Sequence, residues 1–265
     1  MNAHLSPRDL AEIRRSAEEA RKVVLNPQEL AHLDRYLNPP ESSPYPLEYS
    51  FYLLGDVRGK TVLDLGCGSG ECLFPLARRG AHVIGVDISP ELIELAAKRA
   101  DAAGIQANLK VGSAYETGLP DGSIDVIFCM SLIHHLDIAK VRNEMLRVMA
   151  PAGYIVLKEP IRFSKSYARV RNLLPAHGDI SDFEHPLTPA ELATMTEPFT
   201  VEGLRYFRLP IVPITIRWFP AANVTAWKLS GWVLRNLPAA KTYATSVAMR
   251  LRRQSSTLDF SSSKA

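Results

Sequence analysis

The chain has 265 residues, of which 46% are apolar, so it is long enough for one large α/β domain with additions and a sizeable core. It contains no uninterrupted apolar run of about 18 residues and its first residues lack an apolar signal core, so we expect a cytoplasmic protein. Its three cysteines, Cys67, Cys72 and Cys129, form no C-x-x-C pair, which favours reduced thiols and argues against structural zinc.

Charge is unevenly distributed along the chain. Residues 1–200 hold 21 Lys and Arg against 26 Asp and Glu, a balance of −5, whereas residues 201–265 hold 10 against 2, a balance of +8. Aromatic residues, including Trp218 and Trp232, are interleaved with these cations. Two interpretations stay open: a solvated basic face, or an entrance for an apolar acceptor that touches an anionic membrane surface.

The N-terminal part is predicted to be a helix followed by a linker. Ser6 suits an N-cap position and Pro7 the first position of a helix, and apolar residues follow at helical spacing. Residues 38–46 carry four prolines, which exclude a helix there. We therefore expect residues 1–46 to form a helical segment and a proline-rich linker, and a short helix to lead into the first strand.

The stretch "TVLDLGCGSGECL" predicts a buried strand that runs into a bare turn. Residues 61–65 are β-branched or apolar apart from Asp64, and Gly66, Gly68 and Gly70 then remove the Cβ atom at alternate positions. Glycine adopts positive φ readily and lets a ligand approach the main chain. A helical pattern follows at once, which makes half of a nucleotide-binding βαβ unit. A tight turn without a ligand is the alternative.

Strands and helices alternate from this point. We expect strands near 81–87, 107–114, 123–130 and 154–160, with helices over 89–104 and 136–153 between them. This alternation predicts a doubly wound, mostly parallel seven-stranded sheet that binds its ligand at the carboxyl ends of the strands.

The last part of the chain gives weaker signals. Residues 161–190 are irregular and suit an insertion that covers a substrate, and residues 199–219 suggest two closing strands, the second an edge strand because of Pro210 and Pro213. Apolar residues between 240 and 251 recur at helical spacing. We therefore predict a basic helical C-terminal extension over 221–253 and a disordered tail over 254–265.

The glycine spacing separates two kinds of cofactor loop. A dinucleotide fingerprint needs a third glycine at position 71, which is Glu71 here, so an NAD(P)-dependent oxidoreductase is the less favoured alternative. The sequence "VLDLGCGSG", followed by "VIGVDIS", "LPDGSIDVIFCMSLIHHL" and "RVMAPAGYIVLKEP", resembles the class I S-adenosylmethionine-dependent methyltransferases over roughly residues 45–160. It is most similar to the subgroup of quinone-biosynthesis and natural-product methyltransferases.

The resemblance implies a Rossmann-like methyltransferase domain over 47–220 that uses S-adenosyl-L-methionine and releases S-adenosyl-L-homocysteine. It places the methionine moiety along Gly66 to Gly68, with Asp64 facing its ammonium group, and Asp87 at the ribose hydroxyls, since a carboxylate suits a diol. The remaining cofactor contacts that it implies are Cys67, Ile88, Ser113, Ala114, Cys129 and Met130. Ser113 stands where the family often has an acid, so Glu116 or the backbone is left to bind the adenine amino group. Helix capping by the two acids is the structural alternative.

Methyl transfer needs mainly alignment and exclusion of water, and it needs a base only if the acceptor arrives protonated. His135, just past the fourth strand, is the first choice of base and His185 the second, while purely structural roles for the histidines stay open. No acid completes a metal-ligand spacing with His134, His135 and His185, so no metal is expected.

The expected partner is a small, apolar acceptor for O-, C- or N-methylation. Nucleic acid is disfavoured because no recognisable RNA-binding module accompanies the basic residues. A peripheral membrane contact through the basic C-terminal segment stays open beside a plain solvated face, and the oligomeric state is open as well. A non-catalytic module that only binds S-adenosylmethionine is the remaining alternative.

Overall fold

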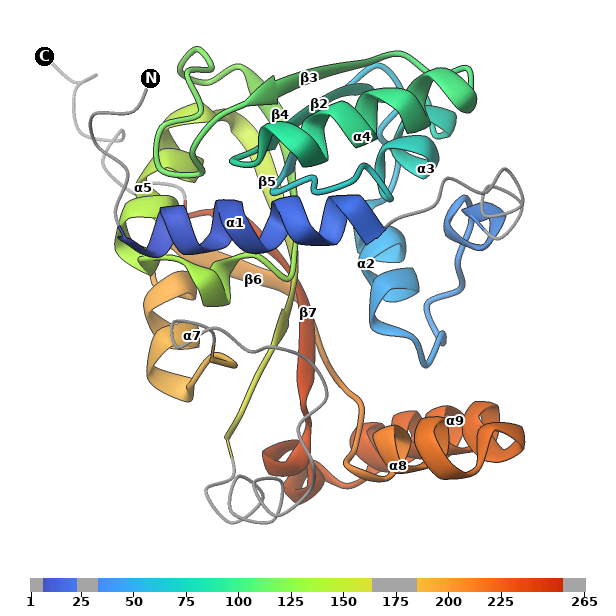
Figure 1. Ribbon diagram of the computed structural model, residues 1–265. Coiled ribbons are helices and arrows are strands. Elements are labelled where there is room, and N and C mark those ends of the chain that lie inside the picture. The colour runs from blue at the N-terminus through green and yellow to red at the C-terminus, as the bar shows by residue number, and fades with distance from the viewer. Residues whose placement is uncertain (1–6, 23–32, 164–184, 255–265) are drawn as a thin grey trace, which may run out of the picture.

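A single seven-stranded sheet organises the computed structural model, which describes residues 7–22, 33–163 and 185–254 (Figure 1). The spatial order is β3-β2-β1-β4-β5-β7-β6. The first five strands in sequence pair in parallel, whereas β7 is antiparallel to both β5 and β6. This confirms the predicted doubly wound, mostly parallel sheet. The strands are β1 Thr61–Leu65, β2 His82–Asp87, β3 Ala107–Val111, β4 Ile124–Met130, β5 Met149–Pro160, β6 Phe199–Phe207 and β7 Ser246–Arg253.

Helices cover both faces of the sheet. Buried side chains of α2, α3 and α4 pack on one face, and those of α5 and α7 pack on the other, while α1 lies against α4 (Figure 1). The α-helices are α1 Pro7–Lys22, α2 Pro46–Leu54, α3 Leu73–Arg78, α4 Pro90–Ala102, α5 Ile138–Val148, α7 Pro189–Thr196, α8 Ile211–Trp218 and α9 Asn223–Asn236. Short 3-10 turns occur at η2 Ile133–His135, η3 Pro220–Ala222 and η4 Pro238–Tyr243.

Local sequence signals explain where several helices begin. Ser89 caps α4, its Oγ accepting from the Leu92 N–H at 3.3 Å, with Pro90 at the first helical position. Thr188 and Glu191 form a reciprocal capping box at the start of α7. Each cap satisfies backbone donors that the helix itself leaves without partners. The sequence therefore correctly predicts where α4 begins, and this start determines the direction in which the first turn of the helix faces.

Alternation of side chains across the strands builds a core on each face. Val126 and Phe128 of β4 pack on the face of α2 and α3, whereas Ile127 and Cys129 pack on the face of α5. Tyr154 of β5 links the sheet to α2 on the first of these faces, because its hydroxyl donates to the Leu54 carbonyl at 2.5 Å. Burial of both faces explains why the parallel strands read as nearly continuous apolar runs.

The prediction for the C-terminal part is wrong at two places. Residues 211–218, expected as an edge strand, form α8, where Pro213 lies in the first turn and so removes no helical hydrogen bond. Residues 246–253, expected as part of a basic helical extension over 221–253, form β7 instead. Val247 and Ala248 are both fully buried, each on a different face. A strand buried on both faces gives an apolar run that also fits helical spacing.

Other predicted features lie partly outside the described residues. Most of the insertion predicted over 161–190 and nearly all of the tail predicted over 254–265 fall there. The remaining predicted domain boundaries stay predictions. None of the described helices combines the length and the apolar character needed to cross a membrane.

The position of β7 inside the sheet predicts a large cost for truncating its core side chains. Leu251 is fully buried and lies opposite Ile155 and Val201 on the neighbouring strands. Leu251→Ala is expected to lower the free energy of unfolding by about 2–5 kcal/mol, because it leaves a cavity. Urea denaturation measures this, with Leu204→Ala on the exposed side of β6 as the control, expected to cost less than about 1 kcal/mol. Equal losses would contradict a central β7.

Candidate active site

The glycine turn after β1 is fastened to β2. The N–H groups of Gly66 and Cys67 both donate to the Val86 carbonyl, at 2.8 and 3.1 Å. Gly66, Gly68 and Gly70 have φ values of 72°, 52° and 83°, which confirms the predicted positive φ. The turn therefore holds its backbone at the carboxyl edge of the sheet.

The glycines differ in what surrounds them. A Cβ atom on Gly66 would lie 2.8 Å from the Leu132 side chain, and one on Gly70 would lie 2.8 Å from Leu73. A Cβ atom on Gly68 would meet no protein atom within 4 Å. Close packing thus explains two of the glycines, whereas Gly68 borders open space that a ligand can fill.

Asp87 joins the end of β2 to this turn. Its Oδ2 accepts from the Gly68 N–H and its Oδ1 from the Ser89 N–H, both at 2.9 Å. Burial raises the pKa of Asp87, and the backbone hydrogen bonds oppose that rise. Each carboxylate oxygen keeps further acceptor capacity, so Asp87 is able to hold the turn and accept from a diol together.

Asp64 is the buried acid of the site. It lies on β1 between Gly85 of β2 and Phe128 of β4, and it is only 2% exposed. Its Oδ2 has no hydrogen-bond partner among the described residues. Burial, with smaller contributions from Asp87 and Glu71, raises the pKa of Asp64 to about 7. A buried carboxylate without a partner is costly, so this oxygen suits a cationic group of a ligand.

The other predicted cofactor contacts surround the same edge to different degrees. Ile88 is half-buried beside Asp87, and Ser113 and Ala114 follow the end of β3. The Ser113 hydroxyl accepts from the Tyr115 N–H at 3.2 Å. Met130 is partly exposed at the end of β4, whereas Cys129 is fully buried in the core. Packing therefore accounts for the Cys129 side chain, and its role beside a cofactor stays a prediction.

A buried Glu–His pair lies where β4 and β5 end. Glu159 is completely buried, and its Oε1 accepts from the N–H groups of Leu132 and Ile133 at 2.9 and 2.8 Å. Its Oε2 lies 2.8 Å from Nδ1 of His134. The carboxylate thus fixes the turn after β4 and orients the imidazole, so that an Nδ1–H donor leaves Nε2 as the basic nitrogen.

The structure places the two predicted bases on different elements. The His135 ring is half-buried and lies 4.0 Å from the His134 ring, centroid to centroid. His185 is half-exposed, and its Nε2 lies 2.8 Å from the Glu191 carboxylate in the first turn of α7. His134 and His135 therefore belong to the edge of β4, while His185 is tied to α7.

Sequence reasoning missed Ser131, Lys158 and Glu159. Ser131 adopts a φ of 58°, which is rare for a residue other than glycine and is concentrated at functional sites. Its N–H donates to the Lys158 carbonyl at 2.7 Å. Burial lowers the pKa of the Lys158 amine. The sequence did contain a signal for these residues, because Lys158 and Glu159 are adjacent charged residues at the end of the apolar run "YIVLKEP".

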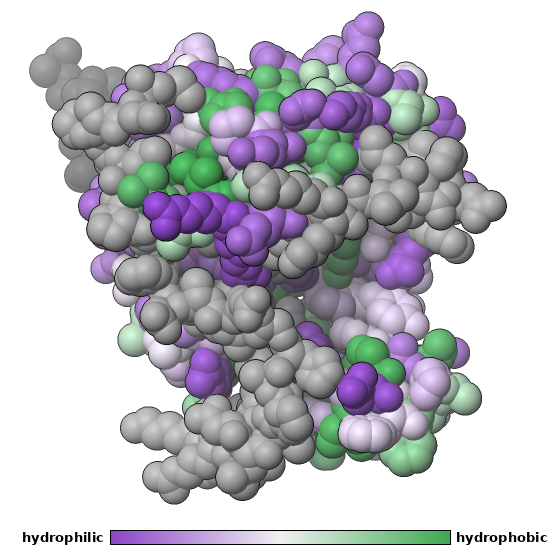
Figure 2. All heavy atoms as spheres, viewed as in Figure 1, coloured by the Kyte–Doolittle hydropathy of each residue, from purple (hydrophilic) through white to green (hydrophobic). Residues whose placement is uncertain are grey.

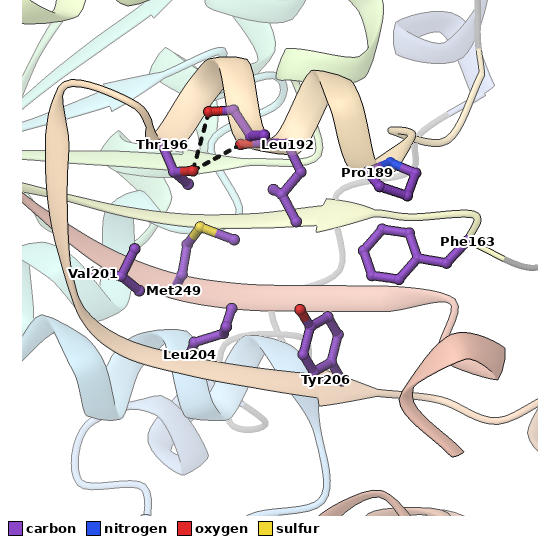
Figure 3. A pocket seen from close by; sticks show the side chains of 9 residues that line it. Phe163, Pro189, Leu192, Thr196, Val201, Leu204, Tyr206 and Met249 are labelled. Atoms are coloured by element: carbon purple, nitrogen blue, oxygen red, sulfur yellow. Dashed lines mark hydrogen bonds between the residues drawn. The ribbon is translucent and has the colours of Figure 1, made fainter. Parts of the chain in front are cut away.

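An apolar pocket of about 300 Å³ lies elsewhere, between α7 and the edge formed by β6 and β7 (Figure 3). Leu192 points into it from α7, and Leu204 and Tyr206 from β6 (Figure 3). None of its lining residues belongs to the glycine turn or to the ends of β1, β2 and β4. It is therefore distinct from the site built around Asp64.

Within the described ranges, no group of three His, Cys, Asp or Glu side chains is placed to hold a metal ion. The described cysteines are all free thiols. The site therefore consists of the glycine turn, the two acids and the residues that end β3, β4 and β5.

An open glycine turn at a strand end, an acid closing the next strand and a parallel sheet define a Rossmann-like protein that binds a nucleoside-containing cofactor. The comparisons with known proteins then specify the family. Residues 62–153 match the model of the family described as methyltransferase domain.

Two curated relatives are ubiquinone biosynthesis O-methyltransferases. The protein from Psychrobacter arcticus is 34% identical over 182 residues, which cover 63% of this chain and 68% of the relative. The protein from Psychrobacter cryohalolentis is 32% identical over 177 residues, with the same coverage of 63% and 68%. The chain therefore belongs to the S-adenosylmethionine-dependent methyltransferases.

Solved structures show the same fold. Geranyl diphosphate C-methyltransferase from Streptomyces coelicolor A3(2) aligns with a TM-score of 0.62 at 18% identity, covering 95% of this chain and 100% of that one. A geranyl diphosphate methyltransferase bound to sinefungin aligns with a TM-score of 0.56 at 18% identity, covering 78% of each chain. The chain is therefore an S-adenosylmethionine-dependent methyltransferase rather than an NAD(P)-dependent oxidoreductase.

The raised pKa of Asp64 predicts a pH dependence of stability. Its folded-state pKa of about 7 lies above the model value of 3.8, so its contribution to stability is complete below the lower value and is lost as the pH rises through 7. Asp64→Asn removes this loss. In thermal melts without cofactor, the melting temperature of the variant should therefore rise relative to that of the wild type between pH 5 and pH 8. The expected rise is about 2–4 °C for each kcal/mol of stability that the wild type loses.

Asp101→Asn, at an exposed acid on α4, is the control for the melts and should run parallel to the wild type. A constant difference between Asp64→Asn and the wild type across this pH range would contradict the buried, unpaired carboxylate.

Proposed function

We propose that the chain methylates a small, apolar acceptor at the carboxyl edge of β4 and β5, next to a cofactor held by the ends of β1, β2 and β3. The unpartnered Oδ2 of Asp64 carries this proposal, because it is a buried carboxyl oxygen without a partner among the described residues, and a cationic ligand group would pair with it when the acid ionises. The open space at Gly68 supports a ligand in contact with the same turn.

The residues present fit S-adenosylmethionine. Asp64 would bind the ammonium group, the backbone of Gly66, Cys67 and Gly68 would run along the methionine moiety, and Asp87 would accept from the ribose hydroxyls. Ile88 would pack against adenine, with Ser113 and Ala114 at its edge. Cys129 and Met130, which end β4, would flank the sulfur.

S-adenosylmethionine supplies an activated methyl group on a sulfonium. The task of the chain is to align the acceptor and exclude water, since positive charge disappears during the transfer. A phenol or enol acceptor also has to lose a proton. His134 is better placed for that role than the first choice from sequence, His135, because Glu159 orients its ring. His185 would serve only if the acceptor reached α7.

The named relatives and the chemistry of the surface support the class of acceptor. Relatives named ubiquinone biosynthesis O-methyltransferases favour transfer to an oxygen of an apolar aromatic molecule. Exposed aromatic residues and cations at the C-terminal part favour an acceptor that arrives from a membrane, with peripheral contact between this part and the lipid.

Gly68→Val tests the open side of the turn. The valine side chain should fill the space along the main chain and weaken binding of S-adenosylhomocysteine by at least about tenfold, which is 1.4 kcal/mol. Gly122→Val is the matched control, because Gly122 also has a positive φ, of 62°, with no atom near its Cβ position, but precedes β4 at the opposite edge. Titration calorimetry on both folded variants decides. Undiminished affinity in Gly68→Val would place the cofactor elsewhere.

His134→Gln tests the base, once an acceptor has been found by incorporation of labelled methyl groups from an extract. Removing a general base typically lowers the rate by about 10²- to 10⁴-fold while leaving cofactor affinity nearly intact. Glu159→Gln should move the pH profile of turnover, since the carboxylate sets the orientation of the imidazole. Turnover and cofactor affinity are also measured for His135→Gln and His185→Gln, which test the two bases predicted from the sequence.

A loss below tenfold in all three histidine variants would mean that alignment alone drives the transfer. A parallel loss of cofactor affinity would make the histidine concerned structural.

A further inference from the structure

Residues 208–243 form a helical lobe that projects from the sheet (Figure 1). The lobe, which consists of α8, η3, α9 and η4, is inserted between β6 and β7. Phe207 at the end of β6 pairs with Ser246 at the start of β7, and Ser246 pairs with Pro160 at the end of β5. The lobe therefore leaves the sheet at the carboxyl edge of the parallel strands, where the proposed site lies.

The exposed face of α9 carries large apolar side chains. The buried residues of the helix are Ala226, Ser230, Gly231 and Leu234, of which three are small, while Val224 and Trp232 are 52% and 55% exposed. A helix that packs only on a core places its large apolar side chains inward. The outward face of α9 is therefore built to be covered.

The exposed apolar side chains are gathered on the lobe. Trp218 is 69% exposed and Phe219 is 62% exposed, at the turn between α8 and α9. Apolar side chains lie beside strongly hydrophilic ones on the surface of the lobe (Figure 2). A patch of this kind marks an interaction surface. Its large members are Ile211, Ile214, Ile216, Trp218, Phe219, Val224, Leu229, Trp232, Leu237 and Tyr243.

The charge of the lobe is of one sign. Arg217, Lys228, Arg235 and Lys241 are exposed, and the chain has no Asp or Glu between residues 203 and 258. No described carboxylate forms an ion pair with any of these four cations. The basic residues of β7 differ, because Arg250 and Arg252 both pair with Glu202 and so belong to the sheet.

We propose that the lobe docks on an anionic membrane surface, with Trp218, Phe219 and Trp232 inserted between the lipids and the four cations at the headgroups. Aromatic and aliphatic side chains next to Lys and Arg suit this interface. A second copy of the chain is a poorer occupant, because it would bring the same positive charges face to face. Docking turns the carboxyl edge of β5 toward the bilayer. That this edge then serves as the entrance for an apolar acceptor rests on the proposed function, whereas the docking itself does not.

Tryptophan fluorescence reports directly on this lobe. All three tryptophans of the chain, Trp218, Trp227 and Trp232, belong to α8 and α9. Vesicles of phosphatidylcholine that contain some phosphatidylglycerol should shift their emission to the blue and carry the protein down in sedimentation. Vesicles of phosphatidylcholine alone should bind less. Binding should weaken in about 1 M salt, where the screening length falls to about 3 Å.

Substitutions separate the lobe from the rest of the surface. The double variant Trp218→Ser, Phe219→Ser should weaken vesicle binding by about tenfold to hundredfold, whereas Val201→Ser, at a 43% exposed residue of β6, should leave it unchanged. Lys228→Gln and Arg235→Gln should each weaken binding about fivefold. Lys140→Gln on α5 is the control for charge.

Three outcomes would overturn the proposal. The first is equal failure to bind neutral and anionic vesicles at low salt, and the second is binding that the lobe variants leave intact. The third is a dimer without vesicles that Trp218→Ser, Phe219→Ser converts to a monomer, which would make a second copy the occupant. Titration of S-adenosylhomocysteine into the same variants should give wild-type affinity, so loss of docking is distinguishable from failure of the proposed function.

Discussion

The arrangement of the site depends on one buried carboxylate. Asp64 stands inside the sheet with neighbouring strands on both sides, and its Oδ2 is left without a partner among the described residues. A position of this kind costs free energy in the empty protein, since desolvation favours the neutral acid. It is explained if a cationic ligand supplies the partner. The ammonium of the methionine moiety is the proposed cation.

The surrounding backbone is built to present that acid. Gly66 approaches Leu132, so the turns after β1 and β4 lie against each other, while Asp87 fixes the open residue Gly68. The turn after β4 is fixed in the same way by Glu159. Asp87 and Glu159 thus hold two turns by accepting backbone N–H groups, whereas Oδ2 of Asp64 accepts from no described group and is left for the ligand. Such preorganisation is what a reaction that depends on alignment requires.

The parts that could be predicted from sequence are those with local causes. Positive φ at three glycines, the cap at Ser89 and the burial of β1 and β4 all follow from residue types and spacing. The strand β7 could not be recognised, because its apolar residues satisfy helical spacing and its place is decided by pairing with β5 and β6, which are distant in sequence. The contact between Glu159 and His134 likewise joins residues 25 apart, so no spacing rule reveals it.

Proton release on cofactor binding tests the central claim most directly. If Asp64, with a pKa of about 7, becomes ionised when it pairs with the ammonium group, S-adenosylhomocysteine should release about half a proton per molecule bound at pH 7. Titration calorimetry in buffers of different ionisation enthalpy measures this number. The expected result is that release falls close to zero in Asp64→Asn. Binding without proton release, or the same release from the variant, would contradict the assignment of the buried carboxylate to the cofactor.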